Sequence, residues 1–74
     1  MVSIKQDVKR DEMAALLNIV ADAMPRAGHA QDLKAIAQRV KRGENDPAHL
    51  LIGCESDLGS LVAGCVSRIL KHDW

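Results

Sequence analysis

Hydrophobic positions recur with a helical period in the first third of the chain. Between residues 9 and 24 they follow the i, i+3, i+4, i+7 spacing of one helix face, at Met13, Leu16, Leu17, Val20 and Met24. Pro25 follows and predicts the end of this helix, because the residue before a proline is disfavoured in α conformation. Ile4 and Val8 lie out of phase with this stripe. Residues 1–8 are therefore predicted to form a separate turn or a mobile arm.

A second helix is predicted over about residues 31–42. Its apolar stripe consists of Leu33, Ile36, Ala37 and Val40, and Gly43 is a typical C-terminal stop. The connection "PRAGHAQ" is short, so the first two helices are expected to form an antiparallel hairpin.

The third apolar segment begins at "NDPAHLL", where Asp46 is a good N-cap and Pro47 suits the first helical position. The segment is either one helix to about residue 72 or a short helix broken near Gly53. The hydrophobic phase continues through Gly53, which favours a single helix of about 25 residues. The sequence thus predicts an all-α fold, a helical hairpin plus a longer C-terminal helix, in one three-helix domain over residues 9–74.

The two cysteines, Cys54 and Cys65, are eleven residues apart in this predicted helix. Eleven residues is close to three turns, so both would share a face while lying about 16 Å apart along the axis. That distance excludes a disulfide within one chain. No zinc-type ligand spacing is present either, and we interpret both cysteines as small apolar residues of the packed stripe.

Small residues accompany the bulky stripe of the third helix, and two glycines inside a predicted helix suggest close packing. We expect a homodimer in which two such helices cross antiparallel near Gly59 and Ser60, with Cys54 of one chain opposite Cys65 of the other. The predicted interface comprises Ile19, Cys54, Leu58, Gly59, Leu61, Val62, Ala63, Cys65, Val66, Ile69 and Trp74.

The composition restricts the classes of function. In 74 residues there are ten basic and ten acidic side chains, no Phe, no Tyr and a single Trp. A balanced charge gives no general attraction to nucleic acid or anionic membrane, and base-stacking aromatic residues are lacking. The sequence has no catalytic constellation, cofactor fingerprint, signal peptide or membrane span. We expect a cytoplasmic protein that is not an enzyme and holds no cofactor or metal.

The preferred interpretation is a small helical protein–protein interaction module that docks on a larger protein as a regulator, inhibitor or adaptor. The alternative is a DNA-binding regulator, because "LKAIAQRVKRG" resembles the first half of a helix-turn-helix. In that case the nucleic-acid contacts would be Lys34, Arg39, Lys41 and Arg42. Neutral net charge and the apolar residues of the following segment weigh against it.

Overall fold

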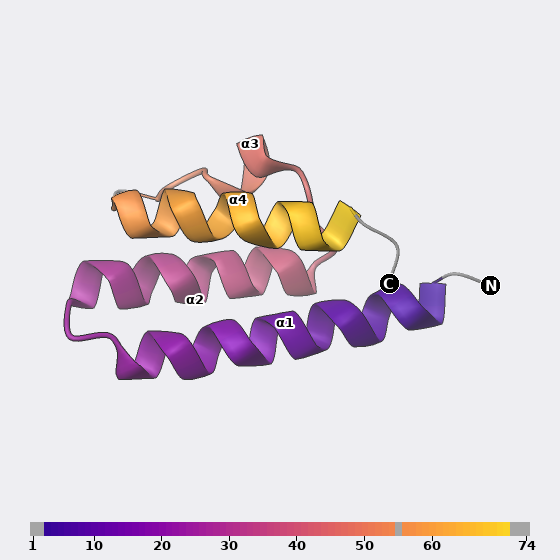
Figure 1. The fold of residues 1–74 in the computed structure, drawn as a ribbon, viewed down its shortest axis with the longest axis horizontal. Coiled ribbons are helices and arrows are strands. Elements are labelled where there is room, and N and C mark those ends of the chain that lie inside the picture. The colour runs from indigo at the N-terminus through magenta and orange to yellow at the C-terminus, as the bar shows by residue number, and fades with distance from the viewer. Residues whose placement is uncertain (1–2, 55, 72–74) are drawn as a thin grey trace.

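The computed structural model describes residues 3–54 and 56–71 of the chain, with side chains from Lys9 onward. Four helices occupy these ranges (Figure 1): α1 Ser3–Ala23, α2 Ala27–Lys41, α3 Pro47–Leu50 and α4 Asp57–Lys71. The all-helical fold and the hairpin of the first two helices are confirmed.

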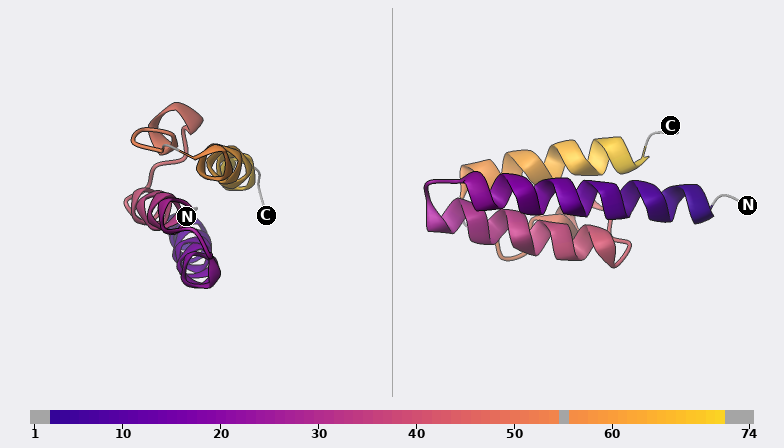
Figure 2. Two further views of the ribbon diagram at one scale, coloured as in Figure 1. Left: turned by 90° about the vertical axis from the view of Figure 1, so that its left-hand side faces the viewer. Right: turned by 90° about the horizontal axis from the view of Figure 1, so that it is seen from below.

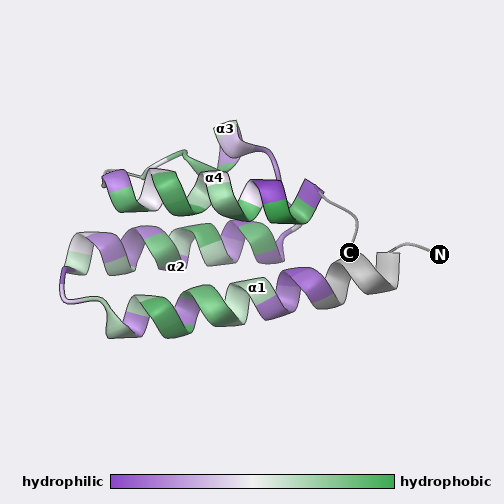
Figure 3. Ribbon diagram, in the orientation of Figure 1, coloured by the Kyte–Doolittle hydropathy of each residue, from purple (hydrophilic) through white to green (hydrophobic). Residues whose placement is uncertain are grey.

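The three long helices run side by side, with α2 in the middle (Figure 1). Seen end-on, α1 and α4 lie on the same side of α2, while α3 and its flanking loops lie beyond α4 (Figure 2). Hydrophobic residues occur along each of the three long helices, α1, α2 and α4 (Figure 3). One buried cluster joins the helices, formed by Ala14, Leu17, Ala21, Leu33, Ile36, Ala37, Val40, Leu50, Ala63, Val66 and Leu70.

The second helix behaves as its pattern predicts. Leu33, Ile36, Ala37 and Val40 are all buried, and the helix ends at Lys41, just before Gly43. It begins earlier than expected, at Ala27, because only three residues after α1 are needed to reverse the chain.

The first helix differs from its prediction in extent and in orientation. It runs without interruption from Ser3 to Ala23, so the backbone does not divide near residue 9. It packs through Ala14, Leu17 and Ala21. Of the predicted stripe only Leu17 is fully buried, while Met13 and Met24 are partly buried and Leu16 and Val20 are exposed. Alanines permit a close approach of two helix axes, which accounts for the choice of this face against α2.

The prediction of one continuous helix from Pro47 to about residue 72 is wrong. After the four-residue α3, the chain turns at Leu51–Gly53 and a new helix begins at Asp57. Gly53 has φ +81°, a left-handed conformation that glycine adopts without a steric penalty. Cys54 therefore lies in a loop and Cys65 in α4, so no continuous helix face joins them.

Candidate interaction surface

The start of α4 is anchored by a carboxylate from α2. Asp32 is 7% exposed, and its Oδ2 accepts hydrogen bonds from Ser56 N at 2.9 Å and from Ser56 Oγ at 2.6 Å. Ser56 Oγ in turn accepts from the N–H of Gly59 at 3.0 Å, so it satisfies a free donor of the first helical turn. A negative charge at this end of α4 also complements the helix dipole. The anchor fixes the position of α4 on α2.

Gly59 is required by that anchor. A Cβ atom at this position would lie 2.9 Å from both Cβ and Oδ2 of Asp32, closer than side chains approach one another. The glycine predicted to lie at a dimer crossing point is therefore buried inside the monomer, against α2.

A second polar contact of α2, made by Arg39, holds the segment that contains α3 and its flanking turns, residues 43–54, which we call the α3 loop. Nη1 of the Arg39 guanidinium lies 3.3 Å from the carbonyl oxygens of both His49 and Leu50 and also contacts that of Ile52, so its two hydrogens are shared among these three acceptors. Asp46 caps the start of α3, as predicted, by accepting from Ala48 N at 3.0 Å. Ser67 Oγ of α4 donates to the carbonyl of Asn45 at 2.5 Å, which attaches the same loop to α4.

Two of the four proposed nucleic-acid contacts are engaged within the fold. Arg39 binds the α3 loop, and Lys34 pairs with Asp22 of α1 at 3.2 Å. Lys41 and Arg42 are exposed at the end of α2. The helix after α2 is α3, and four residues are too few for a recognition helix in a major groove.

The structure leaves an apolar surface on α1 and α4, which we call the apolar face. On α1 it comprises Leu16, Ile19 and Val20, of which Leu16 is 59% and Ile19 65% exposed. On α4 it comprises Leu61, Cys65 and Ile69, of which Leu61 is 66% exposed. Half-buried Met13, Met24 and Val62 connect these side chains to the core.

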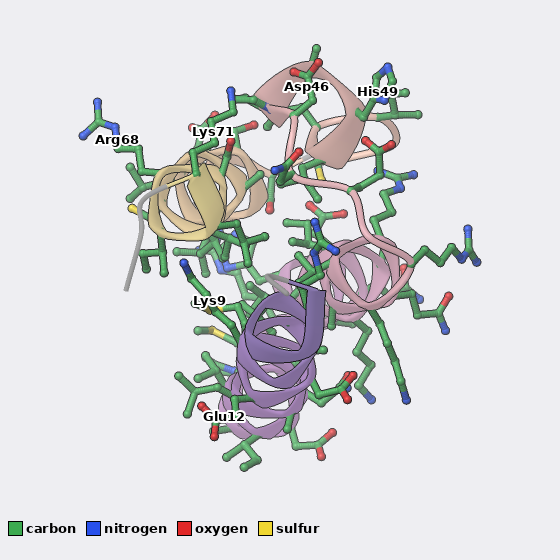
Figure 4. The ribbon with its side chains drawn as sticks, turned by 90° about the vertical axis from the view of Figure 1, so that its right-hand side faces the viewer. Lys9, Glu12, Asp46, His49, Arg68 and Lys71 are labelled. Atoms are coloured by element: carbon green, nitrogen blue, oxygen red, sulfur yellow. The ribbon has the colours of Figure 1, made fainter. Side chains whose placement is uncertain are left out.

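The two halves of the apolar face lie on the same side of the molecule. Figure 4 shows Lys9 pointing from α1 toward α4. Leu16 and Val20 follow Lys9 at i+7 and i+11, so they share its side of α1. On α4, the side that carries Ser67 is turned to the α3 loop. The opposite side, with Val62, Cys65 and Ile69, therefore borders α1.

A shallow hollow lies on the outer side of α4, next to the apolar face. It has a volume of about 210 Å³ and is lined by Ser60, Leu61, Gly64, Cys65 and Arg68. No protein atom outside the local helix comes within 4 Å of where a Cβ of Gly64 would lie, so the hollow is open at this point. It can accept an apolar side chain from a partner.

No protein-family profile, curated protein or solved structure matches this chain.

The predicted interface residues are divided by the fold. Ile19, Leu61, Cys65 and Ile69 are exposed on the apolar face, and Leu58 and Val62 lie half-buried at its inner edge. Gly59, Ala63 and Val66 are buried inside the chain and present no surface to a partner in this structure. Cys54 is half-buried in the loop after α3, where it packs against the core cluster. Trp74 lies outside the described residues.

Sequence reasoning missed Leu16 and Val20, because it placed them in the core. It also missed Asp32 and Arg39 as structural groups. A signal for Asp32 was present: it lies one helical turn before Ile36, on the core side of α2, where an unpaired carboxylate is costly. Arg39 has no comparable signal, since its partners are backbone carbonyls that exist only once the loop is formed.

Within the described residues, no helix combines the length and hydropathy needed to cross a membrane. The same part of the chain contains no group of three His, Cys, Asp or Glu side chains arranged to hold a metal ion.

The two thiols differ in their surroundings. Burial, with a contribution from the Asp32 carboxylate, raises the pKa of Cys54 above the usual value, and Arg39 opposes this only in part. The Cys54 thiol also donates to the Leu50 carbonyl at 3.4 Å, whereas Cys65 is exposed. Because the thiolate is the nucleophile, we expect iodoacetamide at pH 7.5 to alkylate Cys65 about tenfold faster than Cys54.

Peptide mapping by mass spectrometry at timed intervals measures both alkylation rates in one sample. In urea the rates should converge, which serves as the control. Equal rates in the native protein would contradict the half-buried position of Cys54. The raised pKa of Cys54 also makes the free energy of unfolding depend on pH. Below the ordinary thiol pKa this group adds no pH dependence, and the free energy of unfolding falls as pH rises through the higher pKa of the folded state.

Proposed function

We propose that this protein is a non-enzymatic interaction module that regulates, inhibits or adapts a larger protein by docking its apolar face on it. The apolar face carries the proposal, because Leu16, Ile19 and Leu61 are each more than half exposed on neighbouring helices of one small chain. Single exposed apolar residues are common, but a contiguous apolar patch on a small protein is typical of a binding surface.

The helices that present this face are held rigidly from behind. The Asp32–Ser56 anchor and the hairpin packing fix α4 and α1 on α2. A preformed surface loses little conformational entropy on binding, which favours affinity for a partner. An amphipathic helix or an apolar ridge of the partner is the complementary shape.

An enzymatic function has less support. The hollow beside Gly64, at about 210 Å³, is by itself smaller than the pockets of about 300 Å³ and above that usually bind small molecules, so we do not interpret it as a substrate site. In the described part of the chain, the closest polar pair that includes a histidine is His49 Nδ1 with Glu44 Oε2, 2.7 Å apart on the exposed α3 side. DNA binding also has less support, since Arg39 and Lys34 are engaged in the fold.

Site-specific photo-crosslinking in the native host tests the proposal. A photoreactive residue replacing Leu61 should give covalent adducts with a second protein, because this side chain is 66% exposed on the apolar face. The matched control is the same residue at Gln38, which is exposed on α2 away from that face. We expect the adduct yield at Leu61 to exceed that at Gln38 about tenfold, because side chains inside an interface are held against the partner while those outside it meet only solvent. Equal yields, or adducts only between copies of this chain, would argue against docking on a larger protein.

A further inference from the structure

The apolar face is bordered by opposite charges. Glu12 on α1 and Arg68 on α4 are exposed and point away from each other, at opposite margins (Figure 4). The start of α1 and the end of α4 lie toward the same end of the molecule (Figure 1), and so do the N-terminal half of α1, with Glu12, and the last turn of α4, with Arg68. Within the described residues, neither makes an ion pair or side-chain hydrogen bond in the monomer. An acidic side chain at one margin and a basic side chain at the other, both without an ion pair in the monomer, can pair with each other across a two-fold axis.

We propose that the partner seated on the apolar face is a second copy of this chain, packed with its α1 antiparallel to α4. This inference uses the same apolar face as the proposed function, and a larger protein that docks there would have to displace the second copy. The two-fold axis lies between the two apolar faces and runs parallel to the helices. It places α4 of each copy on α1 of the other. Each Arg68 then lies opposite Glu12 of the second copy, so the charge pair forms twice.

The register set by this charge pair also matches the apolar positions. In an antiparallel pair of helices with equal rise, the numbers of facing residues have a constant sum. If Arg68 faces Glu12, then Gly64 faces Leu16 and Leu61 faces Ile19. The exposed Leu16 thus meets the hollow over Gly64, and the two most exposed apolar side chains of the face meet each other.

Charge reversal tests the pairing by sedimentation equilibrium from about 5 to 500 μM at low salt. The wild type should be a dimer at the upper concentrations, and the mass should not increase further, because the two-fold contact closes. Arg68→Glu alone and Glu12→Lys alone each place two like-charged pairs in the homodimer. We expect each variant to dimerise about tenfold more weakly. Lys41→Glu changes the charge by the same amount at an exposed position of α2, outside the apolar face, and should leave the dissociation constant unchanged.

Mixing the two variants gives the decisive result. In a heterodimer of the Arg68→Glu chain and the Glu12→Lys chain, both charge pairs are again attractive. The mixture should recover the wild-type dissociation constant, and higher salt should reduce the difference among all samples. Circular dichroism confirms that each variant is folded.

The outcomes separate this inference from the proposed function. A wild type that remains monomeric to 500 μM, or a mixture that does not recover dimerisation, would overturn the second copy as occupant. Adducts with another protein at Leu61 would still support docking in that case. Conversely, a dimer that passes the charge test without such adducts would support self-pairing and contradict docking on a larger partner.

Discussion

Gly59→Ala is expected to destabilise the protein by about 2 kcal/mol, a large share of the stability of a chain of this size. The new Cβ would lie 2.9 Å from Cβ of Asp32, which belongs to the backbone-proximal part of the side chain and has little freedom to move. Either α4 shifts away from α2 or the Asp32 carboxylate leaves Ser56. The loss in packing exceeds the gain of about 1 kcal/mol that alanine brings inside a helix.

Gly64→Ala, five residues later in α4, is the matched control. No atom outside the local helix lies within 4 Å of its Cβ position, so only the gain in helix propensity remains. We expect stabilisation by about 0.5 to 1 kcal/mol. Urea unfolding at a low micromolar concentration, monitored by circular dichroism, measures both variants. Equal effects of the two substitutions would show that α4 does not contact α2 through Gly59.

Arg39→Ala is expected to cost about 2 to 3 kcal/mol, because it removes charge-assisted hydrogen bonds to the carbonyls of His49, Leu50 and Ile52. Without them the turn that separates α3 from α4 loses its attachment to α2. Hydrogen exchange of the amides in the α3 loop should accelerate, while the amides in the middle of α2 retain protection until global unfolding.

Lys41→Ala is the control for Arg39→Ala, since both remove one positive charge from the end of α2. Lys41 is exposed and has no described role in the fold, so its replacement should change stability by less than about 0.5 kcal/mol. If Arg39 were instead a phosphate-binding residue, the two variants would be equally stable and both would weaken DNA binding. The comparison thus tests the structural role of Arg39 against the helix-turn-helix alternative.

The Asp32–Ser56 anchor and the contacts of Arg39 with the α3 loop explain how a short chain presents large apolar side chains without collapsing around them. Arg39 and Asp32 both project from α2 and fix the segments on either side of the break between α3 and α4. If a second copy occupies the apolar face, a larger protein that binds there has to displace it. Docking would then depend on the concentration of the chain itself.

Local pattern was sufficient for α2 and for the hairpin. The stripe at Leu33, Ile36, Ala37 and Val40 is narrow and regular, and only one helix face can bury it. For α1 the pattern predicted a single stripe that includes Leu16, Leu17 and Val20, and of these three only Leu17 is buried. The chain buries the side with Ala14 and Ala21 in preference to the one with Leu16 and Val20, a choice that depends on the surface α2 offers.

The C-terminal third shows where periodicity fails. Hydrophobic phase continues from Leu51 past Gly53 into α4, although the backbone turns between them. The turn is stabilised by Arg39, and the restart of the helix by Asp32, which is 24 residues from Ser56 in the sequence. A sequence window that covers one helix contains neither contact.

The amino-acid sequence by itself determined the helical class, the hairpin, the core stripe of α2 and the cap at Asp46, because these depend on interactions between residues within a few positions of each other. Only the tertiary structure decided that the last segment is two helices, that Gly59 lies against Asp32, and that Leu16, Ile19 and Leu61 remain outside. Those outcomes depend on how closely one helix can approach another and on polar groups that meet across long stretches of chain.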